Sequence, residues 1–118
     1  MQLFIASHGI EVKRRIRKRI EQRLRFAANR FERHLHEIAV HVADENGPRG
    51  GVDTVCRLTA RFHDGSAIRI EEKDANIMGA ISRAAKRFRT AILRRMGRMK
   101  TRMYRGAPPA TATEIWIG

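Results

Sequence analysis

Arginine and lysine are the residues of this 118-residue chain whose number and spacing could do chemistry, and that chemistry is the binding of anions. Ten basic residues and no acid lie between Ala75 and Thr113, and ten more accompany only three glutamates between Glu11 and Leu35, within a net charge of +13. Many cations bound to closely spaced phosphates release counterions, so nucleic acid is the polyanion that fits this pattern best. Arginine predominates over lysine, and its guanidinium group grips phosphate with two hydrogen bonds and stacks on bases.

Other kinds of chemistry have little support in the sequence. No glycine-rich phosphate loop, HExxH motif, paired-cysteine site or nucleophile motif is present, so we expect no enzyme, no cofactor and no small-molecule substrate. The five histidines lack cysteine partners, and no metal site is expected. The single cysteine, Cys56, lies in an alternating apolar pattern and is predicted to be a core residue. With no long apolar run and no basic leader, the chain is expected in the cytoplasm and not in a membrane.

The apolar pattern changes its period along the chain and so predicts the elements that carry the basic residues. Apolar residues repeat with helical spacing over 12–35, which predicts a helix about 36 Å long, and again over 77–99. Alternating patterns predict strands, and Asp64-Gly65 predicts a two-residue hairpin between two of them. The expected fold is α+β, in the order β-α-β-β-β-α, with two helices packed on one face of a four-stranded, mostly antiparallel sheet. The predicted strands span residues 2–6, 38–42, 55–62 and 68–71.

The basic residues of each predicted helix fall onto flanks of its apolar stripe when residues are placed 100° apart. On the first helix the three glutamates share one flank, and the other flank carries no acid. On the second helix, arginines recur at i, i+4 or i+7 on one flank. Like charges at i, i+4 destabilise a helix by a few tenths of a kcal/mol per pair, which favours binding over solubility as their purpose. The RNA-binding candidates from these flanks are Arg15, Arg19, Arg23, Arg30, Arg83, Arg87, Arg94 and Arg98.

Four short segments resemble the short bacterial ribosome hibernation-promoting factors, a family that includes ribosome-associated inhibitor A. They are MQLxI at 1–5, IEV at 10–12, FER at 31–33 and the Ala-Ile start of the second helix at 80–81. The resemblance covers about residues 1–103 and extends to the order of elements. It implies binding to 16S rRNA of the small ribosomal subunit, between head and body, where such a factor blocks the mRNA and tRNA sites. Its RNA-contacting positions match Arg23, Arg87, Arg94, Arg95, Arg98 and Lys100.

The chain also departs from that family. Asn76 and Met78 stand where the family has an acidic residue and a tyrosine, and both helices carry arginine at positions that are often acidic in the family. The resemblance predicts a ribosome-binding domain over residues 1–105. The Pro-Pro and Ala/Thr run predicts that 106–118 is a flexible tail, in which Trp116 could instead add a strand or contact a partner. A chain of this length lacks the dimerising domain of the long family members, so direct pairing of two ribosomes by that route is not expected. A monomer is expected when the protein is free.

Two other functions fit the charge pattern. A general double-stranded RNA- or DNA-binding module, not restricted to ribosomes, would use the same arginines on phosphates. The usual element order of such RNA-binding domains is α-β-β-β-α, and the extra first strand here favours the ribosomal factor. A protein-interaction adaptor, such as a sigma-factor regulator, would instead place its basic face against an acidic partner.

Overall fold

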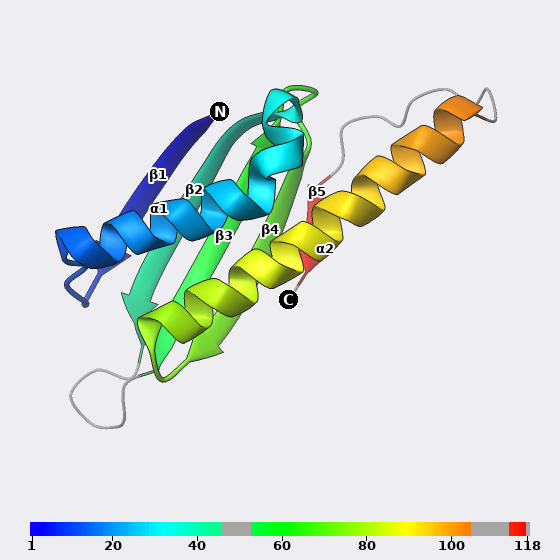
Figure 1. The fold of residues 1–118 in the computed structure, drawn as a ribbon. Coiled ribbons are helices and arrows are strands. Elements are labelled where there is room, and N and C mark those ends of the chain that lie inside the picture. Colours follow the sequence, from blue (N-terminus) through cyan, green and yellow to red (C-terminus); the bar gives the residue numbers. More distant parts are fainter. Residues whose placement is uncertain (46–52, 105–113, 118) are drawn as a thin grey trace.

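The chain folds into a twisted mixed sheet with helices α1 and α2 on one of its faces (Figure 1). The computed structural model describes residues 1–45, 53–104 and 114–117, with the backbone alone for 98–104 and 114–117. The observed order confirms the predicted β-α-β-β-β-α succession and adds a 3₁₀ helix, η1, and a short fifth strand. The elements are β1 (Gln2–His8), α1 (Arg14–Ala28), η1 (Asn29–His34), β2 (Leu35–Asp44), β3 (Thr54–Phe62), β4 (Ala67–Asp74), α2 (Ile77–Tyr104) and β5 (Glu114–Ile117).

The strand pairing follows from the connections between strands. β1 and β2 are parallel neighbours, so the chain must return over the sheet between them, and α1 makes that crossover. β2 with β3 and β3 with β4 are antiparallel. The β3–β4 turn contains Gly65 at a φ of +90°, a conformation that glycine adopts without steric cost. The four strands β1 to β4 therefore confirm the predicted fold class and a hairpin between β3 and β4. The prediction of a two-residue turn was wrong, because Phe62 N–H donates to the carbonyl oxygen of Ser66 and three residues, 63–65, lie between that pair.

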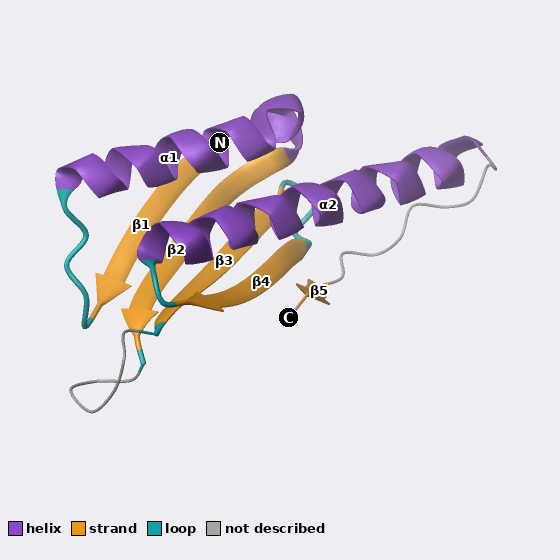
Figure 2. Ribbon diagram, turned by 60° about the horizontal axis from the view of Figure 1, so that its bottom comes forward, coloured by secondary structure: helices purple, strands orange, loops and turns teal. Residues whose placement is uncertain are grey.

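The core lies between the sheet and the two helices, which share one side of it (Figure 2). Leu24 of α1 and Phe88 of α2 are fully buried, and they meet buried residues of the central strands such as Leu58. Cys56 is buried in the same cluster, which confirms the prediction that it is a core residue. Burial, with a smaller contribution from the charge of Glu72, raises the pKa of its thiol to about 12. The described helices include none long and apolar enough to cross a membrane.

The first helix is shorter than its apolar pattern predicted. α1 has 15 residues and is about 22 Å long, not 36 Å, because the chain tightens at Asn29 into η1 and Leu35 begins β2. Phe31 still packs against the core and Leu35 is fully buried. The apolar repeat therefore predicted correctly which residues of α1, η1 and the start of β2 face the core. The longer helix is α2, with 28 residues and a length of about 42 Å.

The C-terminal segment contains a strand within the tail that was expected to be flexible. β5 pairs in parallel with the outer edge of β4, and Trp116 lies in register with Arg69. This is the strand addition that the sequence left open for Trp116. Residues 105–113 and 118 lie outside the described residues, and the flexibility predicted for 106–118 stays a prediction.

Candidate nucleic-acid interface

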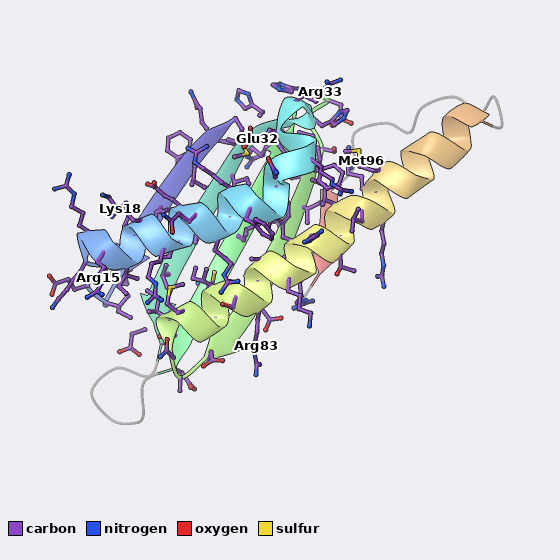
Figure 3. All side chains as sticks on the ribbon, viewed as in Figure 1. Arg15, Lys18, Glu32, Arg33, Arg83 and Met96 are labelled. Carbon is purple, nitrogen blue, oxygen red and sulfur yellow. The ribbon has the colours of Figure 1, made fainter. Side chains whose placement is uncertain are left out.

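The arginines predicted on α1 lie on the side of that helix that faces α2. Figure 3 shows Arg15 on this side and Lys18 on the opposite side. The opposite side is the one next to β1, because Arg17 Nη1 donates a hydrogen bond over 3.1 Å to a carbonyl oxygen of that strand. Arg19 and Arg23 follow Arg15 at steps of four residues, about one turn each, and therefore share its flank.

The arginines of this flank are exposed to solvent, and so is Arg30 of η1, the element that follows α1. Within residues 1–45 and 53–97, none of the four guanidinium groups has a recorded ion pair or hydrogen bond. Because solvated cations without protein partners lose only water and counterions when they meet a phosphate, they are well suited to a polyanion. We call Arg15, Arg19, Arg23 and Arg30 the α1 basic flank.

Phe26 lies within the α1 basic flank and was not among the predicted site residues. Its side chain is 71% exposed, the highest value among the large hydrophobic residues of the described chain. It follows Arg19 by seven residues and Arg23 by three, spacings that place all three on one side of α1, and Arg30 follows in η1. The sequence signal was available, because Phe26 falls outside the apolar stripe that Leu24 and Ala27 continue into the core.

The arginines predicted on α2 face a different part of the molecule. Arg83 Nε lies 3.6 Å from Asp74 Oδ2, and Arg87 Nη1 lies 2.7 Å from Glu72 Oε1 and 3.2 Å from the carbonyl oxygen of Glu71. Both pairs join α2 to β4, so this flank points toward the β4 edge of the sheet and away from α1. Figure 3 places Arg83 on that outer side of α2.

The remaining α2 candidates differ in how much the structure shows of them. Arg94 follows Arg87 by seven residues, shares its flank and is exposed. Arg98 and Lys100 belong to α2, but their side chains lie outside the described part of the chain. The predicted set is thus divided between a flank that faces the other helix and a flank that faces β4, and it does not form one continuous patch.

Arg95 is held inside the fold. Its side chain is 11% exposed, and Nη2 lies 2.7 Å from Asp64 Oδ2 in the β3–β4 turn. The same nitrogen hydrogen-bonds to the Ser66 hydroxyl, and the guanidinium carbon lies 4.1 Å above the centre of the Phe62 ring. Burial alone would raise the pKa of Asp64, but hydrogen bonds from Ser66 and the charge of Arg95 outweigh it and hold that pKa below its usual value. This geometry ties α2 to the hairpin.

Two basic residues of α2 outside the predicted set lie on the side toward α1 and η1. Figure 3 shows Met96 on that side, and Met96 lines a pocket together with Arg33 of η1. Arg89 precedes Met96 by seven residues and shares its flank, and Lys86 lies one turn before Arg89. Both are exposed. Their spacing was visible in the sequence, but nothing local distinguished this flank from the one that carries Arg83.

The sheet face turned away from the helices has its charges paired. Arg57 on β3 contacts Glu45 at 2.6 Å and Glu71 at 3.4 Å, and Arg61 contacts Glu37 at 3.3 Å. These ion pairs neutralise much of the positive charge of that face. Among the described residues, no group of three or more His, Cys, Asp or Glu side chains is placed to hold a metal. The exposed arginines of α1 and η1, which have no ion pair in the described structure, lie on the helical side instead.

Comparison with known proteins relates the whole fold to ribosomal factors. The model of the family described as Sigma 54 modulation protein / S30EA ribosomal protein matches residues 3–100. The Thermus thermophilus Protein Y N-terminal domain superimposes with a TM-score of 0.66 at 23% identity, covering 80% of this chain and 98% of that one. A ribosomal subunit interface protein from Coxiella burnetii superimposes with a TM-score of 0.67 at 11% identity, covering 82% and 99%. At these identities the two structures show the shared fold. No curated protein sequence matches the chain significantly.

Proposed function

This chain belongs to the Sigma 54 modulation protein / S30EA ribosomal protein family, a family of ribosome-associated factors, and we propose that it inhibits translation by binding 16S rRNA of the small ribosomal subunit. In the cell it would act as a hibernation factor, in the cytoplasm and as a monomer when free. The printed names of the structural relatives, a Protein Y domain and a ribosomal subunit interface protein, support a site on the ribosome.

The observation that carries the proposal is the α1 basic flank. Its arginines are exposed and have no protein partner among the described residues, while arginines of β3 on the opposite face are paired with glutamates. Ribosomal RNA presents dense phosphates, and an arginine row on a rigid helix can contact several of them at once. Lys86 and Arg89 of α2 would extend this surface from the neighbouring helix.

The proposed mechanism is occupation of a site. Two helices fixed on a sheet form a rigid body, and once anchored by its arginines it would exclude mRNA or tRNA from the decoding region by volume. No covalent step is involved, so inhibition should be stoichiometric and reach its full extent near one protein per ribosome. The rRNA should remain intact.

A direct test is binding to purified small subunits across a range of salt. If the four arginines of the α1 basic flank each contact a phosphate, affinity should fall by about 100-fold between 50 and 200 mM salt. Initiator tRNA should compete with the protein, and translation should stop at equimolar protein. A salt-independent affinity would contradict the proposal.

The competing function is that of a general duplex binder. Such a protein would bind a naked RNA or DNA duplex as tightly as it binds the small subunit, and initiator tRNA bound to the subunit would not weaken its binding. Comparing small subunits, a naked duplex and an acidic protein at one salt concentration separates the three functions that the charge pattern allows.

A further inference from the structure

Phe26 is the most exposed large hydrophobic residue of the described chain, and its neighbours on α1 are arginines. Arg23 precedes it by three residues and Arg19 by seven, so both lie on its side of α1, and Arg30 follows it in the next element, η1. The nearest acid along α1 is Glu21, and a difference of five residues places it about 140° away around the helix. Phe26 is 71% exposed, and all three flanking arginines, Arg19 included, are exposed as well.

A ring in this setting has a specific chemical use. Arginines can hold the phosphates on either side of a nucleotide while the ring offers a flat apolar face to its base. A duplex does not offer that face, because its bases are stacked on each other, whereas an unpaired nucleotide does. An acidic protein would satisfy the arginines but gives no reason for an aromatic ring in particular.

We propose that Phe26 stacks on an unpaired base of single-stranded RNA, with Arg19, Arg23 and Arg30 on the flanking phosphates. This site deepens the proposed function and rests on it, since it places the α1 basic flank against an unpaired segment of rRNA. It also assigns the protein a preference for single-stranded over double-stranded RNA, which phosphate contacts alone do not provide.

The test compares an unstructured 12-nucleotide RNA with a 12-base-pair RNA duplex at one salt concentration, using full-length variants. Phe26→Ala should weaken binding of the single strand by about 5- to 150-fold and change duplex binding less than twofold. Phe26→Trp should keep the affinity, and its added fluorescence should be quenched by the single strand. Phe4→Ala is the matched control, because Phe4 is also exposed, at 51%, but lies on β1. It should bind both RNAs like the wild type.

Three outcomes would overturn the stacking site. They are an unchanged affinity in Phe26→Ala, an equal loss for the duplex, and a Phe26→Leu variant that binds the single strand as tightly as the wild type. Circular dichroism of each variant controls for folding. If the single-strand preference depends on Phe26 but the protein does not co-sediment with small subunits, the proposed function fails and the stacking site stands. If Phe26→Ala binds both small subunits and the single strand like the wild type, only the stacking site fails.

Discussion

Helices α1 and α2 both carry rows of arginine, yet the two rows have different surroundings. The α1 basic flank has no acid within reach in the described structure, whereas Arg83, Arg87 and Arg95 of α2 each meet a carboxylate from β4 or the β3–β4 turn. A paired guanidinium must exchange a carboxylate for a phosphate, while an unpaired one loses only water and counterions. The number of arginines on a helix therefore does not show how many are available to an anion, because acids of a neighbouring strand or turn already pair with some of them.

The largest change in affinity for the small subunit is expected when the charge is reversed on one side of α1 only. The triple variant Arg15→Glu, Arg19→Glu and Arg23→Glu should lose at least 100-fold in affinity for small subunits, because three phosphate contacts become repulsive. Circular dichroism should stay unchanged, since exposed substitutions move stability little.

The matched control changes three basic residues on the opposite flank of the same helix. The variant Arg14→Glu, Lys18→Glu and Arg25→Glu alters the net charge equally and should lose much less affinity in the same co-sedimentation assay. An equal loss in both variants would show that total charge, not the flank facing α2, determines binding.

The next largest effect is expected on the stability of the fold when Arg95 is replaced, without a change in affinity for the small subunit. Arg95→Ala removes an ion pair, a hydrogen bond and a cation–π contact from a largely buried side chain, and should lower the free energy of unfolding by about 2–3 kcal/mol. Affinity for small subunits, measured well below the melting temperature, should be unchanged. The neighbouring variant Arg94→Ala should cost less than about 0.5 kcal/mol. A large loss of affinity with normal stability in Arg95→Ala would instead support the RNA-binding role that the family resemblance predicts for this residue.

The different surroundings of Arg94, which is exposed, and Arg95, which pairs with Asp64, show what sequence analysis could not predict. Helical and strand periodicity predicted the element order, the inward faces and the acid-free flank of α1, because these depend on residues a few positions apart. The partners of the α2 arginines lie on other elements: Asp64 is 31 positions from Arg95 and Glu72 is 15 from Arg87. Only the fold brings each pair together, so neither the helical placement that selected Arg87 nor the family resemblance that selected Arg95 could show these partners.

The end of α1 illustrates a second limit. The apolar residues from Val12 to Leu35 keep nearly constant spacing, and an α-helix, a 3₁₀ turn and the start of a strand all bury them. Periodicity reports which side chains point inward, but not where backbone geometry changes. Phe26 is a feature that the sequence did contain. Its position outside the apolar stripe predicts an exposed side chain, and packing against the core does not explain an exposed phenylalanine.

The smallest predicted effect concerns pH and the hairpin. The pKa of Asp64 is lowered in the folded protein, so its contribution to stability is full above the unfolded value of about 3.9 and is lost as pH falls through the folded value. Asp64→Asn removes this contribution, and the stability difference from wild type should shrink below about pH 4. Thermal melts of both proteins between pH 2.5 and 7 measure it. A stability difference between the two proteins that stays constant across this range would show that the Asp64 carboxylate does not contribute to stability.

The most direct test of the central claim, that unpaired α1 arginines form the contact with rRNA, is the salt dependence of small-subunit binding in two neutralised variants. Arg15→Gln with Arg19→Gln should reduce the slope of log affinity against log salt by about 1.4–1.8, since each lost phosphate contact removes about 0.7–0.9. Arg83→Gln with Arg87→Gln should leave that slope unchanged, because these side chains already pair with β4. A reduced slope in the α2 variant and an unchanged one in the α1 variant would contradict the claim.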